Sequence, residues 1–196
     1  MLTLITGLIL FLGIHSLPMF QSARAGLVAR YGDIPFKLAF TVVSFVGLIM
    51  IVVGYGSVRW TEANTQLWLP PTWLGHVATL LMLFAMIALV AAYVPSTIRT
   101  RLKHPMLVGI KVWAFAHLLA NGDLASALLF GTFLAWAVAD RISVKRRGAL
   151  GPLGATSGGV PGDVVVVVVG VALYVFLLLY GHAWLFGVAP IPALSA

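Results

Sequence analysis

The chain has 196 residues, of which 61% are hydrophobic and only 9% are charged, whereas a soluble domain carries about 25% charged residues. Its mean hydropathy is +1.07, so the natural solvent for so much apolar surface is lipid rather than water. The sequence contains no cysteine, which excludes disulfides, thiolate metal sites and the covalent attachment of a c-type haem.

Six apolar stretches follow one another, and most approach the roughly 20 residues that a helix needs to cross a bilayer. The first lacks a basic start and a cleavage pattern, so we expect it to be retained as a helix. The fourth and fifth are short and joined only by Asn121-Gly122-Asp123, which predicts a helical hairpin whose tip finds partners inside the protein. The sequence predicts one all-α domain, a polytopic transmembrane bundle of about six helices, at residues 2–20, 36–58, 72–94, 106–120, 124–139 and 164–187.

Basic residues are concentrated in alternate connections between these stretches. By the positive-inside rule, such connections face the cytoplasm, which places both termini outside it. This arrangement explains most of the formal net charge of +7 without nucleic acid as a partner. The basic residues of the first, third and fifth connections are Arg24, Arg30, Arg99, Arg101, Lys103, Arg141, Lys145, Arg146 and Arg147.

Chemistry is limited to a small set of side chains. The five carboxylates lie at span ends or in connections, so a paired-carboxylate mechanism is poorly supported. Among the histidines, His76 and His182 are expected near the membrane surface, and His104 in the basic third connection caps a helix or meets a polar head group. His15 and His117 are the two that can reach the middle of the bilayer, where a polar side chain is a functional candidate.

The surroundings of these two histidines suit a flat apolar cofactor. Gly109, Trp113 and His117 form one stripe on a helix, and an imidazole from either side could ligate a haem iron. The same stripe also suits plain helix packing, so a buried, hydrogen-bonded histidine remains an equal interpretation. The cations available to haem propionates are Lys103, Arg101 and Arg24 on the cytoplasmic side, with Arg59 as the outer alternative.

The run from His104 to His117, followed by Leu118-Leu119-Ala120-Asn121-Gly122-Asp123, resembles the signature of the NnrU family. Its core has the pattern H-P-x3-G-x3-W-x3-H, and the early Gly13-Ile14-His15-Ser16-Leu17-Pro18 also resembles the first helix of that family. The family consists of small bacterial membrane proteins linked to denitrification. The resemblance implies a bacterial inner membrane location and a redox or nitrogen-oxide linked role.

The same domain is similar to 15-cis-zeta-carotene isomerase, which holds haem b between two histidines and isomerises a carotenoid double bond. Carried over by motif, the resemblance implies non-covalent haem b ligated by His117 and His15, with His104, Gly109 and Trp113 in the surrounding motif. It also implies a polyene substrate or a redox partner, and the chain would then be a haem-dependent cis–trans isomerase. The isomerase chain is longer, and its substrate-facing residues have no match here.

Two other functions are compatible with the sequence. The arginine-rich third connection followed by H-P-x-x-x-G is similar to membrane methyltransferases of the isoprenylcysteine type, in which that run helps to bind S-adenosylmethionine. The acidic and aromatic pair that follows the last helices of those enzymes is missing. A non-catalytic assembly partner of another membrane complex is also compatible.

Overall fold

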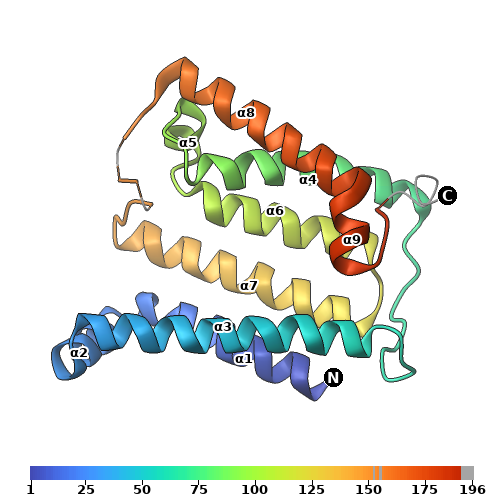
Figure 1. The fold of residues 1–196 in the computed structure, drawn as a ribbon, viewed down its shortest axis with the longest axis horizontal. Helices are drawn as coiled ribbons and strands as arrows, with labels where there is room; N and C mark the ends of the chain where they lie inside the picture. The colour runs from blue at the N-terminus through green and yellow to red at the C-terminus, as the bar shows by residue number, and fades with distance from the viewer. Residues whose placement is uncertain (152, 155, 191–196) are drawn as a thin grey trace.

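A computed structural model describes residues 1–151, 153–154 and 156–190, which form helices joined by short connections (Figure 1). No extended strand occurs in these ranges, and the predicted all-α class is confirmed. The elements in chain order are α1 (Leu2–Ser16) with a 3-10 turn (Leu17–Met19), α2 (Gln21–Tyr31), α3 (Asp33–Val58), α4 (Thr72–Ala91), α5 (Thr97–Leu102), α6 (Pro105–Ala120), α7 (Leu124–Arg146), α8 (Gly159–Phe176), a π-helical turn (Leu177–Gly181) and α9 (His182–Phe186).

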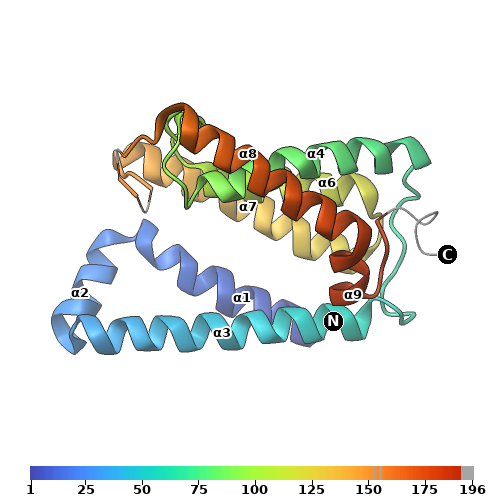
Figure 2. The ribbon, with the colours of Figure 1, turned by 45° about the horizontal axis from the view of Figure 1, so that its top comes forward.

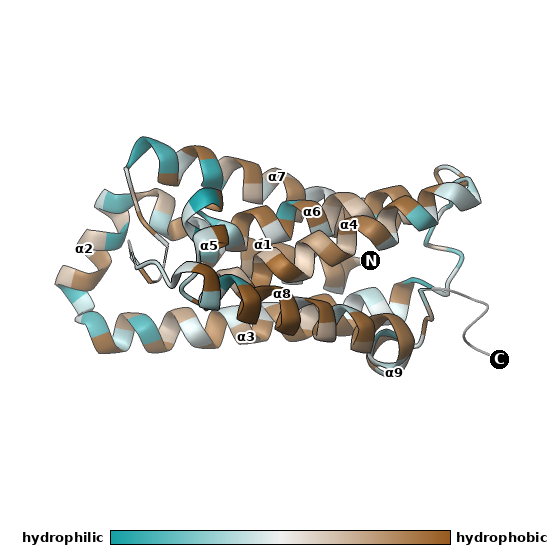
Figure 3. Cartoon of the chain, turned by 90° about the horizontal axis from the view of Figure 1, so that it is seen from above, coloured by the Kyte–Doolittle hydropathy of each residue, from teal (hydrophilic) through white to brown (hydrophobic). Residues whose placement is uncertain are grey.

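Five helical segments in the described ranges are long and apolar enough to cross a membrane, and α6 is apolar but shorter. Figure 3 shows apolar residues along the helix shafts, with hydrophilic ones gathered around α2, α5 and the last turns of α7. Many large apolar side chains on the outer faces are exposed, Val42, Phe45 and Val168 among them. Lipid is the solvent that such a surface needs, so the chain is a multi-pass membrane protein.

The largest differences between the expected and the observed helix boundaries are at the end of α1, the end of α7 and the start of α8. The first helix bends at Pro18 into a 3-10 turn, because proline lacks the N–H that an α-helix requires. The helix α7 continues past residue 139 to Arg146, and α8 begins at Gly159 rather than 164 with Pro161 in its first turn. Hydropathy marks the apolar part of a helix, whereas helical hydrogen bonds continue through polar residues, and a first-turn proline leaves them intact.

The long helices form a curved row in the order α3, α1, α7, α6, α4, α8, as their contacts and Figures 1 and 2 show. The helix α1 is central to one half of the row because it contacts both α3 and α7. Its leucines Leu4, Leu8 and Leu12 recur every four residues and are buried in one cluster with Ile51 of α3 and Phe130 of α7. This spacing places them on one face of a helix. The helix α6 lies in the other half, between α7 and α4.

The hairpin between α6 and α7 has the internal partners that the sequence predicts for its tip. The carbonyl of Gly122 accepts hydrogen bonds from the backbone N–H groups of Leu67 and Trp68, at 2.8 and 3.1 Å. The side-chain oxygen of Asn64 accepts from the N–H of Ala125 at 2.8 Å. The connection between α3 and α4 therefore covers the tip and satisfies backbone groups that lipid could not.

Candidate functional site

His117 lies in the last turn of α6, where its ring is held by the backbone. Its Nδ1 is 2.8 Å from the carbonyl oxygen of Trp113, four residues earlier. Because a carbonyl only accepts hydrogen bonds, Nδ1 carries the proton and Nε2 of the neutral ring keeps a lone pair. Nε2 makes no hydrogen bond to any residue in the described ranges. This arrangement of a backbone-anchored Nδ1 and a free Nε2 is typical of metal-ligating histidines.

His182 is held in the same way on a different element. It begins α9 directly after the π-helical turn, and its Nδ1 lies 2.6 Å from the carbonyl oxygen of Val188. The Nε2 of a neutral His182 therefore also keeps its lone pair. A single π-helical turn inside a long helix is often found at a functional site. Here it sets the direction of the last helical turn, which carries His182.

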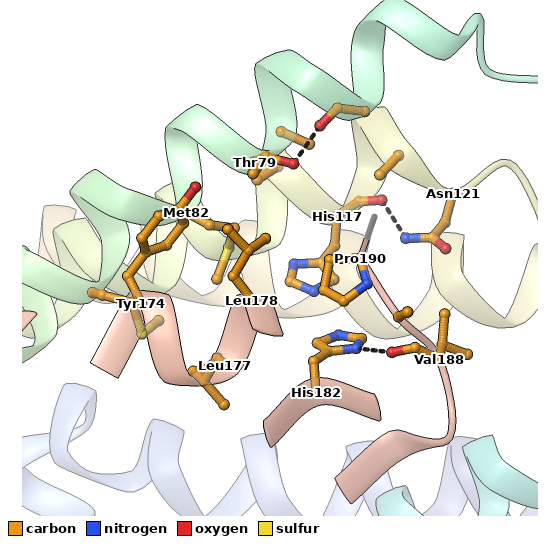
Figure 4. A pocket seen from close by; sticks show the side chains of 16 residues that line it. Thr79, Met82, His117, Asn121, Tyr174, Leu177, Leu178, His182, Val188 and Pro190 are labelled. Carbon is orange, nitrogen blue, oxygen red and sulfur yellow. Dashed lines mark hydrogen bonds between the residues drawn. The ribbon is translucent and has the colours of Figure 1, made fainter. Parts of the chain in front are cut away.

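The rings of His117 and His182 approach each other from elements that are 65 residues apart in the sequence. Their centroids are 6.4 Å apart and their planes differ by 22°. Phe130 of α7 stacks on His117 at 4.4 Å, and Phe186 meets His182 edge-on at 5.0 Å. Figure 4 shows both rings at the same cavity, His117 from α6 and His182 from the C-terminal helix. The fold therefore brings together two imidazoles that are anchored in the same way.

We call this cavity of about 220 Å³ the histidine pocket. Its walls are mostly apolar and come from α4, α6, α8 and the π-helical turn, with Met82, Tyr174 and Leu178 as examples (Figure 4). No lysine, arginine or carboxylate is among the described residues that line it. The imidazoles of His117 and His182 therefore offer nitrogen atoms able to ligate a metal inside a mostly apolar cavity.

His15, the other predicted ligand, lies elsewhere in the molecule. It occupies the last turn of α1, as His117 occupies the last turn of α6. Because these two helices run in opposite directions (Figure 1), the two histidines lie toward opposite ends of the bundle. The ring of His15 stacks on Phe11 at 4.2 Å and also meets Phe40 and Trp136, at 5.1 and 6.2 Å. The structure thus brings His117 together with His182 and not with His15.

The other two residues of the predicted stripe contact His117 or the neighbouring helix rather than the pocket. Trp113 supplies the carbonyl that holds His117, and its ring lies 5.3 Å from the imidazole. Gly109 faces α4, where an added Cβ would lie 2.7 Å from Cγ of Leu89. Gly109 therefore allows α4 and α6 to approach closely, which is the packing interpretation of the stripe.

The predicted cytoplasmic cations do not reach the histidine pocket. Arg101 and Lys103 lie in or just after α5, and His104 precedes α6, so all three are at the end of α6 far from His117. Arg24 lies in α2 over the ring of Phe36.

The outer alternative, Arg59, is close to the site. Its guanidinium donates to the carbonyl of Phe186 at 2.9 Å, and Phe186 contacts His182. Arg59 is therefore the predicted cation that the fold places beside the histidine pair.

His182 was expected near the membrane surface, and its position beside His117 is a finding of the structure. One signal for it exists in the sequence: both residues lie near the C-terminal ends of predicted spans that point to the same side of the membrane. His15 lies near the C-terminal end of a span that points to the opposite side. The direction of each span, combined with the position of the histidine in it, therefore favours the pair that the structure shows.

The chain belongs to the NnrU family. The family model described as NnrU protein matches residues 3–190, which is nearly the whole chain. No curated protein matches the chain, and no solved structure matches it. The match confirms the resemblance that the run from His104 to Asp123 indicates, and the chain is a multi-pass membrane protein of this family.

Proposed function

We propose that the protein binds one haem b non-covalently in the histidine pocket, with His117 and His182 as ligands to the iron, and that it serves redox or nitrogen-oxide chemistry. The observation that carries this proposal is the convergence of two imidazoles whose Nδ1 atoms are anchored to backbone carbonyls. The proposal therefore takes His182 instead of His15 as the second ligand, because the ring of His182 lies beside that of His117.

The donor set favours a metal in a macrocycle over a bare metal ion. Across the described part of the chain, no group of three or more histidine, cysteine, aspartate or glutamate side chains could hold a metal. A zinc site needs three or four protein ligands, whereas a haem would need only one or two protein side chains on its iron. His117 and His182, with centroids 6.4 Å apart at one cavity, are the two side chains that would hold such a group.

The surrounding residues would orient the ligands and exclude water. The carbonyls of Trp113 and Val188 fix the tautomer and the direction of each ring, and Phe130 fixes the plane of His117 by stacking. The mostly apolar walls would limit the access of water to the group, and Arg59, which donates to the carbonyl of Phe186 next to His182, would be the nearest of the predicted cations. A haem held in this way would supply one-electron redox chemistry. Isomerisation of a polyene, which the resemblance to zeta-carotene isomerase implies, is a catalytic extension of the same proposal.

We further propose that the end of the bundle with α5 and the last turns of α7 faces the cytoplasm of a bacterial inner membrane. The basic residues of three connections gather at this end, as the positive-inside rule requires. The histidine pocket then lies toward the outer face, and both termini lie outside the cytoplasm.

An absorption spectrum of the protein, purified after expression with ample haem and recorded oxidised and reduced, tests the haem proposal. We expect a Soret band that shifts on reduction. Substitution of His117 by alanine should remove most of this band, because one of only two protein ligands is lost. His76→Ala is the matched control, since His76 lies in α4 with an exposed side chain. A colourless wild-type protein, or an unchanged spectrum in His117→Ala, would overturn the proposal.

A further inference from the structure

A second cavity, of about 470 Å³, lies at the opposite end of α6. It is formed by α5, the start of α6, the last turns of α7 and part of the segment that follows α7. The charged and titratable side chains that line it are all basic, and we call it the basic pocket: Arg99, Lys103, His104, Arg141 and Lys145. The histidine pocket and the basic pocket share no lining residue.

Arg99 is a buried cation in this cluster. Only 3% of the residue is exposed, and its guanidinium donates to the carbonyls of Thr156 and Gly154, at 2.8 Å each. In the described ranges no carboxylate forms an ion pair with it. Two neutral carbonyls satisfy part of the hydrogen-bonding capacity of a guanidinium, and they do not balance its charge. A buried, unbalanced arginine at a cavity favours an anion as the missing partner.

The carboxylates nearest to the basic pocket are already engaged. Asp140 forms an ion pair with Arg147 at 3.8 Å. Asp163 accepts a hydrogen bond from the N–H of Ile98 at 2.8 Å, which ties α8 to α5. Neither carboxylate is among the residues that line the pocket. The described residues that line the basic pocket therefore include four cations and no carboxylate.

The backbone beside the pocket has an unusual conformation. Lys103 has a φ of 63°, and no other non-glycine residue in the described ranges has a positive φ. Such strained conformations cluster at ligand sites. His104 follows, and its pKa is lowered by burial first and by the charge of Arg141 next. At neutral pH this imidazole is therefore neutral and can donate a hydrogen bond without adding to the repulsion.

From these observations we infer that the basic pocket binds a phosphate group, carried either by an anionic lipid at the membrane surface or by a soluble anion. Topology alone does not require such a pocket. The exposed Arg24 and Arg30 of α2 contribute to the same positive-inside signal, and they lie over the rings of Phe36 and Tyr31 instead of lining a cavity. Basic pockets between membrane helices at the cytoplasmic side are the usual sites of phosphate head groups.

The test compares two double variants with equal loss of charge. Arg141→Gln with Lys145→Gln removes two cations from the basic pocket, and Arg24→Gln with Arg30→Gln removes two exposed cations outside it. Retention of added phosphatidylglycerol, against phosphatidylcholine, is measured by native mass spectrometry of the detergent-purified protein. Binding of inorganic phosphate and pyrophosphate is measured by calorimetry in phosphatidylcholine nanodiscs. At about 1 kcal/mol per cation, we expect roughly thirtyfold weaker binding in the pocket variant alone.

Each outcome either identifies the source of the phosphate group, a lipid or a soluble anion, or overturns the inference. Loss of phosphatidylglycerol retention in the pocket variant alone identifies a lipid head group, and loss of phosphate or pyrophosphate binding there identifies a soluble anion. The inference is overturned if both double variants lose binding equally. It is also overturned if the wild type neither prefers phosphatidylglycerol to phosphatidylcholine nor binds phosphate or pyrophosphate. If circular dichroism shows that the double variant is unfolded, Lys145→Gln replaces it, because this side chain is exposed, with about a fivefold effect expected.

Discussion

The two ends of α6 carry two pockets with opposite chemistry. The histidine pocket has mostly apolar walls and two imidazole rings, whereas the charged side chains among the described residues that line the basic pocket are all cations. Both depend on the length of one helix. The 16 residues of α6 span about 24 Å, which is less than the roughly 30 Å of the hydrocarbon layer. Neighbouring helices extend beyond α6 at both ends, so a short helix leaves room for a pocket at each.

The largest expected effect separates His182 from His15. We expect His182→Ala to lose or strongly shift the Soret band, because it removes one of two converging ligands, and His15→Ala to retain it. Absorption spectra of both variants, at equal protein concentration, check this. Lipid retention at the basic pocket should be unchanged in both. The opposite result, with the band lost in His15→Ala and kept in His182→Ala, would restore the ligand pair predicted from the sequence.

A smaller effect is expected from moving α8, the helix that leads to His182. Gly170 of α8 packs against α4, and a Cβ there would lie 2.8 Å from Cα of Ile87. Gly170→Leu should push α8 away at a cost of about 1–3 kcal/mol and lower haem occupancy without changing lipid retention. Gly56→Leu is the control, since a Cβ at Gly56 meets no atom within 4 Å. Equal haem occupancy in the two variants would show that the position of α8 does not matter to the histidine pocket.

The smallest effect concerns the hairpin tip beside the histidine pocket. Asp123 caps α7 by accepting from the N–H and the hydroxyl of Ser126, at 2.9 and 2.7 Å. Loss of this cap in Asp123→Ala should destabilise the fold by about 1 kcal/mol, measured by unfolding with dodecyl sulfate in mixed micelles. Asp123→Asn should retain most of the cap. Haem binding should weaken before lipid retention does, because the tip adjoins only the histidine pocket.

The pH dependence of that cap sharpens the same test. Burial alone would raise the pKa of Asp123, but the hydrogen bonds from Ser126 and Asn64 outweigh it and hold the pKa below its usual value. A carboxylate with a lowered pKa stabilises the fold above the pKa of the unfolded chain, and this contribution is lost as pH falls through the folded pKa. Asp123→Asn should therefore be less sensitive to acid than the wild type. An identical acid response would assign the sensitivity to other groups.

Much of the architecture was predictable because it depends on local composition. The six predicted spans correspond to observed helices. The sequence also predicted that the hairpin tip has partners inside the protein, and Gly122 and Asn64 make those hydrogen bonds. The resemblance carried by the run from His104 to Asp123 is confirmed by the family match. The C-terminal end of α7 and the start of α8 were misplaced, because hydropathy does not distinguish a polar helical turn from a loop.

The site was only half predictable. His117 stood out by its place in an apolar span, and the structure does place it in the histidine pocket. His182 did not stand out, because its position beside His117 depends on the π-helical turn and on the carbonyl of Val188, neither of which has a sequence signature. Arg101, Lys103 and His104 were assigned to a haem from their motif and charge, although they lie at the other end of α6.

The sequence by itself determined that this chain crosses a membrane several times, where its helices run and which connections carry the positive charge, because each property depends on residues close together in the chain. Only the tertiary structure decided which histidine faces His117 and that the basic residues surround a cavity. The direction of each helix, its rotation about its axis and its neighbours set those contacts, and they arise from packing between segments far apart in the sequence.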